Sequence, residues 1–244
     1  MNTKQILSLV LCVVLMGLVT ACKDKKKNND VTDPTDKQTA TTTGTENGHD
    51  WIDIGLSVRW ATMNIGATTP EGYGNYYAWG ETTSKASYSW DTYTHCIHTG
   101  ASDDGLTKYC IHSNFGHADF TDGLTQLVAT DDAATANWGG KWRMPTLEEC
   151  KALSDNCTWE WVERGNVKGR EITGPNGGKI FLPATGYKSY DAVYYDKQSG
   201  TYWSKELSSG NSQKAVDIVF SSSNHEWAYG DRDHGFPVRA VCPK

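Results

Sequence analysis

Aromatic and charged side chains are concentrated in one stretch near the C-terminal end of the sequence. His225, Trp227 and Tyr229 occupy alternate positions, which places them on one face if the stretch is a strand. Four charged or polar residues follow at once. Aromatic rings can stack on a sugar while polar side chains beside them bind its hydroxyl groups. We therefore predict a ligand-binding surface, and its residues are Trp227, Tyr229, Asp231, Arg232, Asp233 and His234.

The sequence shows no arrangement that is typical of an enzyme. It contains no Gly-x-Ser-x-Gly, His-Glu-x-x-His or phosphate-loop motif. Glu148 and Glu149 form a carboxylate pair, but the start of a helix explains them. We expect Arg143 and Arg239 to make structural hydrogen bonds to backbone or carboxylates. No catalytic residue is predicted.

Residues 92–122 show no sustained periodicity and are expected to form a long insertion. This insertion concentrates potential zinc ligands, which are His95, Cys96, His98, Cys110, His112 and His117. Cys-x-His and His-x-x-His spacings can close on zinc. However, none of these spacings is a recognised zinc motif, and a disulfide between the two cysteines would remove two ligands. We expect no metal here.

The clearest chemical signal lies near the N-terminus, at Cys22. Lys4 supplies a positive charge, and residues 6–19 form an apolar run of 14 residues, which has the layout of a secretory signal and is too short to span a bilayer. The residues before Cys22 are Val-Thr-Ala, as in a bacterial lipobox. We predict removal of residues 1–21, a lipid anchor on Cys22, and location in the cell envelope, at the outer membrane or cell surface.

The remaining chain divides into a tether and one domain. Residues 22–48 contain almost no apolar side chains, so they are predicted to be a disordered tether. Of the 23 basic and 29 acidic residues, Lys4 lies in the signal and five of each sign lie in the tether, which leaves 17 basic and 24 acidic residues in 49–244. This excess of acid argues against nucleic acid as a partner. We predict one domain over residues 49–244.

The elements that must position these residues are mostly short strands. Aromatic residues and glycine are interleaved throughout the domain, which favours strands and tight turns. Thr146 and Glu149 have the spacing of a capping box at a helix start, and a shorter helix is predicted over 131–138. The predicted strands lie within 51–61, 167–173, 179–182, 201–204, 215–220, 225–229 and 236–241. This order predicts an α+β fold with a mostly antiparallel sheet and one or two short helices.

Several sequence blocks resemble one bacterial family. Residues 51–61 are WIDIGLSVRWA, residues 77–81 are YAWGE, and residues 137–146 are NWGGKWRMPT. With Tyr-Trp-Ser at 202–204 and the terminal segment 238–243, these blocks resemble the Fibrobacter succinogenes major paralogous domain. The resemblance covers nearly all of the domain and implies a C-type-lectin-like fold in a secreted or lipid-anchored protein. The activity of that family is largely unassigned.

The envelope location and the resemblance bear on the cysteines and on calcium. An oxidising compartment permits disulfides, and we predict Cys96 with Cys110 across the insertion. The lectin-like habit of tying a helix end to the last strand implies a disulfide between Cys157 and Cys242, and Cys150 is expected to be a buried thiol.

The lectin analogy also suggests calcium, with Asn224, Glu226, Asp231 and Asp233 as candidate ligands. The sequence lacks the lectin and EF-hand signatures, so we expect no cofactor apart from the lipid on Cys22.

These features together predict a non-catalytic binding or adhesion module. Its expected partners are the membrane, through the lipid anchor, and a glycan or a surface protein. One alternative is a structural or assembly component of surface appendages, such as a fimbrial accessory or tip protein. Another is a catalyst like the formylglycine-generating enzymes, because residues 235–239, Gly-Phe-Pro-Val-Arg, resemble a framework strand of that family. The paired active-site cysteines of those enzymes have no counterpart in this sequence.

Overall fold

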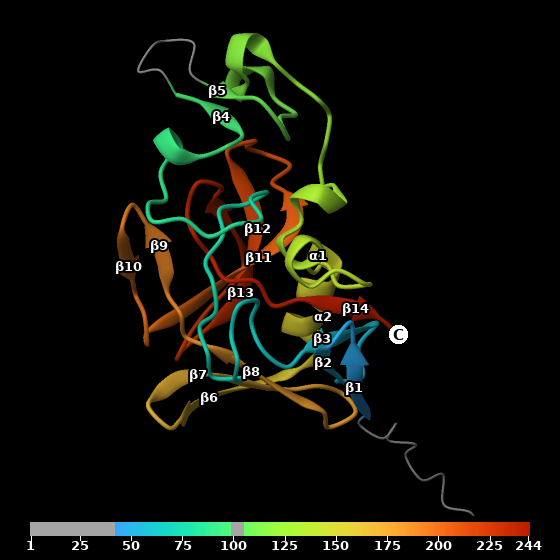
Figure 1. Cartoon of the computed structure of the whole chain (residues 1–244). Helices are drawn as coiled ribbons and strands as arrows, with labels where there is room; N and C mark the ends of the chain where they lie inside the picture. Colours follow the sequence, from blue (N-terminus) through green and yellow to red (C-terminus); the bar gives the residue numbers. More distant parts are fainter. Residues whose placement is uncertain (1–41, 99–104) are drawn as a thin grey trace, which may run out of the picture. The chain divides into compact units, whose positions relative to one another are not determined.

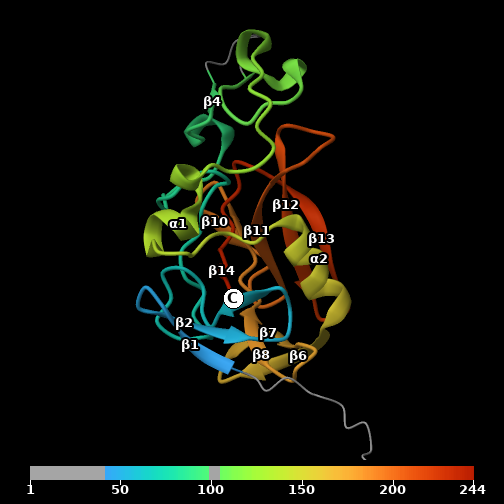
Figure 2. The ribbon, with the colours of Figure 1, turned by 90° about the vertical axis from the view of Figure 1, so that its right-hand side faces the viewer.

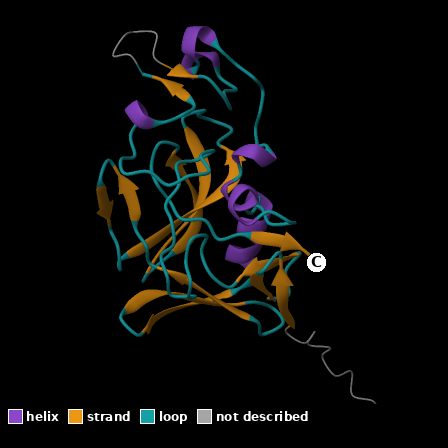
Figure 3. Cartoon of the chain, in the orientation of Figure 1, coloured by secondary structure: helices purple, strands orange, loops and turns teal. Residues whose placement is uncertain are grey.

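The computed structural model describes residues 42–98 and 105–244. Within these residues the chain forms small antiparallel sheets and two short α-helices (Figures 1 and 3). Every pairing between named strands is antiparallel. The fold is therefore α+β, as predicted. The predicted signal peptide, Cys22 and the tether up to residue 41 lie outside the described residues.

The first sheet joins the two ends of the domain. Its strand order is β1-β2-β3-β14. The bounds are β1 (Thr42–Glu46), β2 (His49–Asp53), β3 (Val58–Ala61) and β14 (Val241–Pro243). The predicted hairpin over 51–61 is confirmed, because Trp51 pairs with Ala61 and Ile52 with Trp60. Cys242 lies opposite Arg59, so the last strand extends the sheet that the first strands begin.

Strand β1 lies within residues 22–48, which the sequence analysis assigned to the tether. Thr42–Glu46 pair along their whole length with β2. The turn between the two strands is Asn47-Gly48, in which both residues have positive φ. Asn-Gly is the preferred sequence for such a hairpin turn. The strand is also held by the Trp142 ring, whose Nε1 donates to the carbonyl oxygen of Glu46 at 2.7 Å. Residues 42–48, which the prediction assigned to the tether, therefore form part of the first sheet and its turn.

Two further sheets have three strands each. One has the order β6-β7-β8, with bounds β6 (Thr158–Arg164), β7 (Val167–Thr173) and β8 (Lys179–Pro183). The other has the order β11-β12-β13, with bounds β11 (Ser199–Leu207), β12 (Lys214–Ser221) and β13 (His225–Asp231). The predicted strands in these ranges are confirmed. Strand β6 is an addition, since the sequence analysis left it as a connection.

Both predicted helices are present. Helix α1 (Ala133–Trp138) begins after Asp132, whose carboxylate accepts from the backbone N–H groups of Ala134 and Thr135. Helix α2 (Leu147–Asn156) has the predicted capping box, in which Thr146 and Glu149 each accept from the other's backbone N–H. Helix α2 packs against β13 (Figure 2). Within the part of the chain that the structure describes, no helix is long and apolar enough to cross a membrane.

The strand predicted over 236–241 is mostly absent, and only Val241–Pro243 form a strand. The backbone before Val241 bonds to three separate segments in turn. Tyr77 donates to the carbonyl oxygen of Phe236, Trp203 to that of Pro237, and Ile65 to that of Val238. No single neighbour therefore runs alongside this segment, and Pro237 lacks a donor for a regular ladder.

The remaining short elements lie in the insertion and in one hairpin. The insertion holds β4 (Cys96–Ile97), β5 (Gly105–Leu106) and two 3₁₀ turns, η2 (Ser113–Phe115) and η3 (His117–Asp119), and it is preceded by the 3₁₀ turn η1 (Trp90–Thr92). A fourth 3₁₀ turn, η4 (Ala129–Asp131), precedes α1. The hairpin consists of β9 (Tyr187–Ser189) and β10 (Ala192–Tyr194). The sequence analysis did not predict this hairpin.

No disulfide joins any of the described cysteines, so the predicted Cys96–Cys110 and Cys157–Cys242 pairs are not formed. The strand geometry explains why Cys157 and Cys242 do not pair. Successive side chains of β14 point to opposite faces, so Val241 and Cys242 join different core clusters. Cys157 packs against the cluster of Val241 rather than that of Cys242. Cys150 is a fully buried thiol on α2, as expected, and burial raises its pKa well above the usual value.

Candidate functional site

Trp227 and Tyr229 lie on β13, which is an edge strand of its sheet. Both rings are partly exposed, at 36% and 42%, and they meet edge to face with centroids 5.6 Å apart. The Lys151 ammonium group of α2 lies over the Trp227 ring, 5.4 Å from its centroid. The His225 ring stacks on Trp159, with ring centroids 4.6 Å apart, and His225 is therefore less exposed than the other two. This face of β13 is therefore partly covered by α2 and by β6.

The charged residues that follow do not gather around these rings. Asp231 accepts from Lys214 Nζ at 2.7 Å, within the same sheet. Arg232 and Asp233 are turned into the protein and are buried. The His234 ring stacks on Tyr187 of β9, with centroids 5.2 Å apart. The structure therefore does not bring the six predicted residues together, since they lie in three different surroundings.

Arg232 is a structural residue. Its guanidinium group is completely buried and donates to the carbonyl oxygens of Lys108, Tyr109 and Ser212 at 2.8–3.1 Å. The Nε atom donates to the Tyr93 hydroxyl at 2.9 Å. The same group lies 4.9 Å from the centre of the Trp79 ring. Arg232 therefore joins the insertion to the core, and no part of it is available to a ligand.

Asp233 is buried beside this arginine, and its Oδ1 atom has no hydrogen-bond partner among the described residues. Burial raises the pKa of Asp233 to about 6, and the nearby Asp231 adds to the effect. Asp217 of β12 is similar: its Oδ1 atom is also unpartnered, and burial raises its pKa to about 7. Burial lowers the pKa of His234. Burial therefore brings the pKa values of both aspartates close to neutral pH, and both carboxyl groups are buried.

The most exposed aromatic surface lies elsewhere, on residues 187–195, which we call the tyrosine hairpin. It comprises β9, β10 and the residue after them. Tyr190 is 62% exposed and Tyr195 is 58% exposed. The less exposed Tyr187 supports the others, because its ring stacks on Tyr194 at 5.6 Å and lies 6.0 Å from Tyr195. Tyr187 therefore links the rings of Tyr194 and Tyr195, and it also stacks on His234.

The backbone of the tyrosine hairpin is strained at its exposed residues. Tyr190 and Tyr195 have φ of +52° and +57°, a conformation that side chains with a Cβ rarely adopt. The turn is held because Tyr88 and Tyr190 exchange two backbone hydrogen bonds, at 2.7 and 2.8 Å. At the base of the hairpin, Gly186 has φ of +60°, and a Cβ there would lie 1.9 Å from the carbonyl oxygen of Tyr194. Such strain is often found at functional surfaces.

A cleft of about 490 Å³ adjoins the tyrosine hairpin. It lies between the hairpin's end and the strands β6, β7 and β12. Its eight lining residues are Trp161, Lys168, Tyr195, Lys197, Gln198, Ser199, Ser221 and Ser222. The volume lies within the range of small-molecule sites. The cleft therefore offers two aromatic side chains, two ammonium groups and several hydroxyl and amide groups to one ligand.

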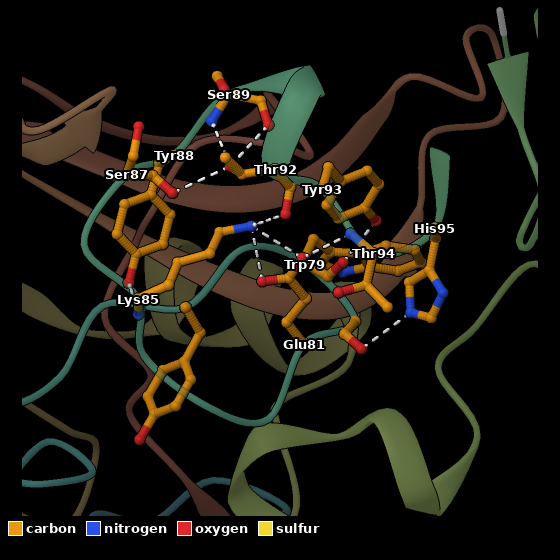
Figure 4. Close-up of polar contacts among 12 residues, drawn as sticks. Trp79, Glu81, Lys85, Ser87, Tyr88, Ser89, Thr92, Tyr93, Thr94 and His95 are labelled. Atoms are coloured by element: carbon orange, nitrogen blue, oxygen red, sulfur yellow. Dashed lines mark hydrogen bonds and ion pairs between the residues drawn. The ribbon is translucent and has the colours of Figure 1, made fainter. Parts of the chain in front are cut away.

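A smaller polar pocket of about 270 Å³ lies at the base of the insertion (Figure 4). The Glu81 carboxylate there accepts from Lys85 Nζ at 2.9 Å and from the backbone N–H of Thr94 at 2.8 Å. His95 Nε2 is 3.0 Å from the carbonyl oxygen of Gly80, so this nitrogen carries the proton. Burial lowers the pKa of His95.

The carboxylates of this pocket are already used by the protein. Asp131 accepts from Lys108 Nζ at 2.6 Å and from the Tyr109 hydroxyl at 2.7 Å. The Lys85 ammonium group also donates to the carbonyl oxygen of Thr92 (Figure 4). These contacts fix the insertion onto the core. We therefore regard this pocket as structural and the tyrosine hairpin with its cleft as the candidate functional site.

The candidate metal ligands are dispersed. Among the described residues, no group of three or more His, Cys, Asp or Glu side chains is placed to hold a metal ion. The Cys110 thiol donates to the carbonyl oxygen of His112, and the His112 ring lies 3.1 Å from the Ser212 hydroxyl. Of the calcium candidates, Asp231 binds Lys214, and Asp233 is buried.

Sequence reasoning missed the tyrosine hairpin because the first residue of its two-residue turn, Tyr190-Asp191, is a tyrosine. Tyr190 occupies a position of positive φ, where glycine or asparagine is expected. The available signal was the density of tyrosine, with four in residues 187–195. Comparison with protein-family models, with curated proteins and with solved structures finds no match for this chain.

Proposed function

We propose that this protein is a non-catalytic binding module, held at the cell envelope by a lipid on Cys22, and that it binds its ligand at the tyrosine hairpin and the adjoining cleft. One observation carries the proposal. Of the seven exposed large apolar side chains in the described residues, four lie in residues 190–195. Contiguous exposed apolar groups mark interaction sites, and tyrosine gives large contact area at a low entropic cost.

We also propose that the domain is related to the Fibrobacter succinogenes major paralogous domain and shares its C-type-lectin-like fold. The residues that carry this resemblance include Trp60, Trp79, Trp142 and Trp203, which are among the largest fully buried side chains. They form the framework of the core. The tyrosine hairpin lies outside all the resembling blocks. We therefore propose that residues outside the resembling blocks determine which ligand is bound. The resemblance concerns the core framework only.

The position of the hairpin suits a tethered binding module. Strand β1, where the described chain begins, lies on the opposite side of the domain from β9 and β10 (Figure 1). A tether of 20 residues, 22–41, would have a root-mean-square reach of about 25 Å if it is a flexible chain. A surface that faces away from the chain's entry is free to meet a ligand that is not itself in the membrane.

The anchor is tested by mass spectrometry of the N-terminal peptide from protein extracted from bacterial envelopes. We expect residues 1–21 to be removed and acyl chains to be attached to Cys22. Cys22→Ala should abolish lipid attachment and leave the uncleaved precursor. Recovery of wild-type protein with an unmodified Cys22 would contradict the anchor, and it would leave the binding proposal untouched.

Binding is tested with the full-length protein, purified in detergent, on an array of neutral and charged glycans. We expect binding to at least one glycan class and its loss in Tyr194→Ala. The fold of each sample is checked by tryptophan fluorescence, since the buried tryptophans report on the core. A folded protein that binds none of the glycans, but binds a purified appendage subunit from the same genome, would favour the assembly alternative.

A further inference from the structure

Lysines outside the cleft are mostly neutralised by carboxylates. Six lysines form ion pairs with N–O distances of 2.5–2.9 Å. They are Lys85, Lys108, Lys151, Lys179, Lys214 and Lys244. This is expected in a chain with a formal net charge of −6, where acids are in excess. The structure describes eleven lysines, so five of them have no carboxylate partner among the described residues.

Lys168 and Lys197 are two such lysines, and both line the same cleft. Neither has a carboxylate within 4.0 Å among the residues that the structure describes. They come from distant parts of the sequence: Lys168 from strand β7 and Lys197 from the connection after β10. The fold therefore brings two unpaired ammonium groups to one cavity.

The acids nearest in sequence or register do not line the cleft. Glu163 lies across from Lys168 in the β6–β7 pair, and Asp196 precedes Lys197. Neither is a lining residue, and none of the eight lining residues is acidic. The residues that line the cleft therefore carry positive charge and no negative charge. Such a charge attracts anions and disfavours cations.

The other walls of the cleft suit a sugar ring. Trp161 and Tyr195 provide aromatic surface, and Trp161 is held from one side by Arg170, whose guanidinium carbon is 5.8 Å from the ring centre. Gln198, Ser199 and Ser222 add amide and hydroxyl groups that can bind sugar hydroxyls. Aromatic surface, neutral hydrogen-bonding groups and ammonium groups together match a saccharide that carries acidic groups.

We infer that the cleft binds an acidic saccharide, with Lys168 and Lys197 contacting its carboxylate or sulfate groups and Trp161 and Tyr195 contacting its rings. This inference rests on the proposed binding function and specifies the ligand of that same site. Carboxylated and sulfated sugars offer the same negative charge and oxygen acceptors to the two ammonium groups, so either kind of sugar could be the ligand.

The test measures binding of oligogalacturonate to full-length protein by isothermal titration, with the fully methyl-esterified oligomer as a neutral probe of the same sugar. A sulfated oligosaccharide forms a second acidic arm, which separates sulfate from carboxylate. The variants are Lys168→Gln and Lys197→Gln, which alter exposed side chains. Lys141→Gln is the matched control, because Lys141 is exposed, has no carboxylate partner among the described residues and lies near β1, away from the cleft.

We expect binding of at least one acidic probe and little binding of the methyl ester. Each cleft variant should weaken binding about three-fold and the double variant about ten-fold, as for exposed charge pairs. The control should bind as the wild type does, and added salt should weaken binding.

Equal binding of the ester and the acid, unchanged by the lysine variants, would overturn this inference and leave the binding function in place. Binding of neither acidic probe, by a protein that binds another glycan through Tyr194, would also overturn it. Loss of all glycan binding would instead count against the binding function itself.

Discussion

Two arginines lie completely inside the protein, and they show how charge is accommodated without a carboxylate. Arg239 donates to Asn64 Oδ1 and to the carbonyl oxygens of Ala61 and Phe181 at 2.9–3.2 Å. Arg232 uses three carbonyl oxygens and the Tyr93 hydroxyl in the same way. The planar guanidinium group presents five N–H donors on three nitrogen atoms, whereas lysine has three donors on a single nitrogen.

Replacement of Arg232 by lysine should therefore damage stability rather than ligand affinity. Arg232→Lys leaves several buried acceptors without a donor, and we expect the free energy of unfolding to fall by about 3 kcal/mol. Urea unfolding followed by tryptophan fluorescence measures this loss. Ligand affinity of the folded fraction should be unchanged. A stable variant with weakened binding would place Arg232 back in the ligand site.

Asp217 should make stability depend on pH. Its pKa is raised from 3.8 to about 7 by burial, opposed in part by Lys214 and by the Gly230 N–H, and supported by Glu226. The folded protein therefore retains a proton that the unfolded chain has lost, so this residue's contribution to stability falls as pH rises from about 4 to about 7. The loss is about 4 kcal/mol at most.

Asp217→Asn should remove this part of the pH dependence, because asparagine stays neutral and can still accept from the Gly230 N–H. Unfolding by urea at pH 5, 6, 7 and 8 compares the two proteins. The exposed Asp196→Asn serves as the control and should follow the wild type. Parallel profiles for wild type and Asp217→Asn would mean that Asp217 is ionised throughout this range.

At the scale of elements, the tyrosine hairpin combines exposed rings with backbone strain. A residue with a Cβ costs about 1–2 kcal/mol at a left-handed position, and glycine avoids that cost. Tyr190→Gly should therefore be more stable than Tyr190→Ala by about 1 kcal/mol, although both lose the same ring. Thermal unfolding of the pair measures the difference. Equal stability would show that the φ of Tyr190 carries no strain.

Helix α2 tests the local signals that sequence reasoning used. The Thr146 hydroxyl accepts from the Glu149 N–H, and the Glu149 carboxylate accepts from the Thr146 N–H and binds Arg143. Thr146→Ala should cost about 1 kcal/mol, while Thr146→Ser should keep the cap. Urea unfolding compares the two variants, and an equal loss in both would assign the effect to packing of the Thr146 methyl group.

Elements with local signals were predictable, and those fixed by distant contacts were not. The residues of the capping box at Thr146 and of the Asn47-Gly48 turn are close together in the sequence, so local patterns can predict both. The sequence analysis nevertheless overlooked the turn. The shortness of the strand Val241–Pro243 depends on which distant segments donate hydrogen bonds to the carbonyl oxygens of the preceding backbone. The tyrosine hairpin depends on Tyr88, which lies about one hundred residues away and holds Tyr190 in a turn that its own sequence disfavours.

In the candidate site, too, local features were predictable and features fixed by distant contacts were not. The alternation of His225, Trp227 and Tyr229 correctly predicted a strand, but the pattern does not reveal that α2 partly covers that face. The charges after it predicted a polar loop, yet the insertion supplies carbonyl groups that draw Arg232 inward. Burial of a charged residue depends on acceptors far away in sequence, which no local pattern contains.

At the scale of the whole molecule, framework and binding surface are separate. The tryptophans that carry the family resemblance lie in the core, and the tyrosine hairpin lies outside the resembling blocks. The chain enters at β1, on the other side of the domain from the hairpin (Figure 1). Changes on the hairpin should therefore alter binding with little effect on stability, whereas changes at the buried tryptophans should destabilise the fold.

The most direct test of this account compares the two exposed aromatic pairs on one protein. Glycan affinity is measured for full-length wild type, for Tyr194→Ala with Tyr195→Ala, and for Trp227→Ala with Tyr229→Ala. Loss of two stacking rings should weaken binding by at least about ten-fold in the hairpin variant, and the β13 variant should bind as the wild type does. Loss of binding in the β13 variant, with the hairpin variant unaffected, would contradict the central claim.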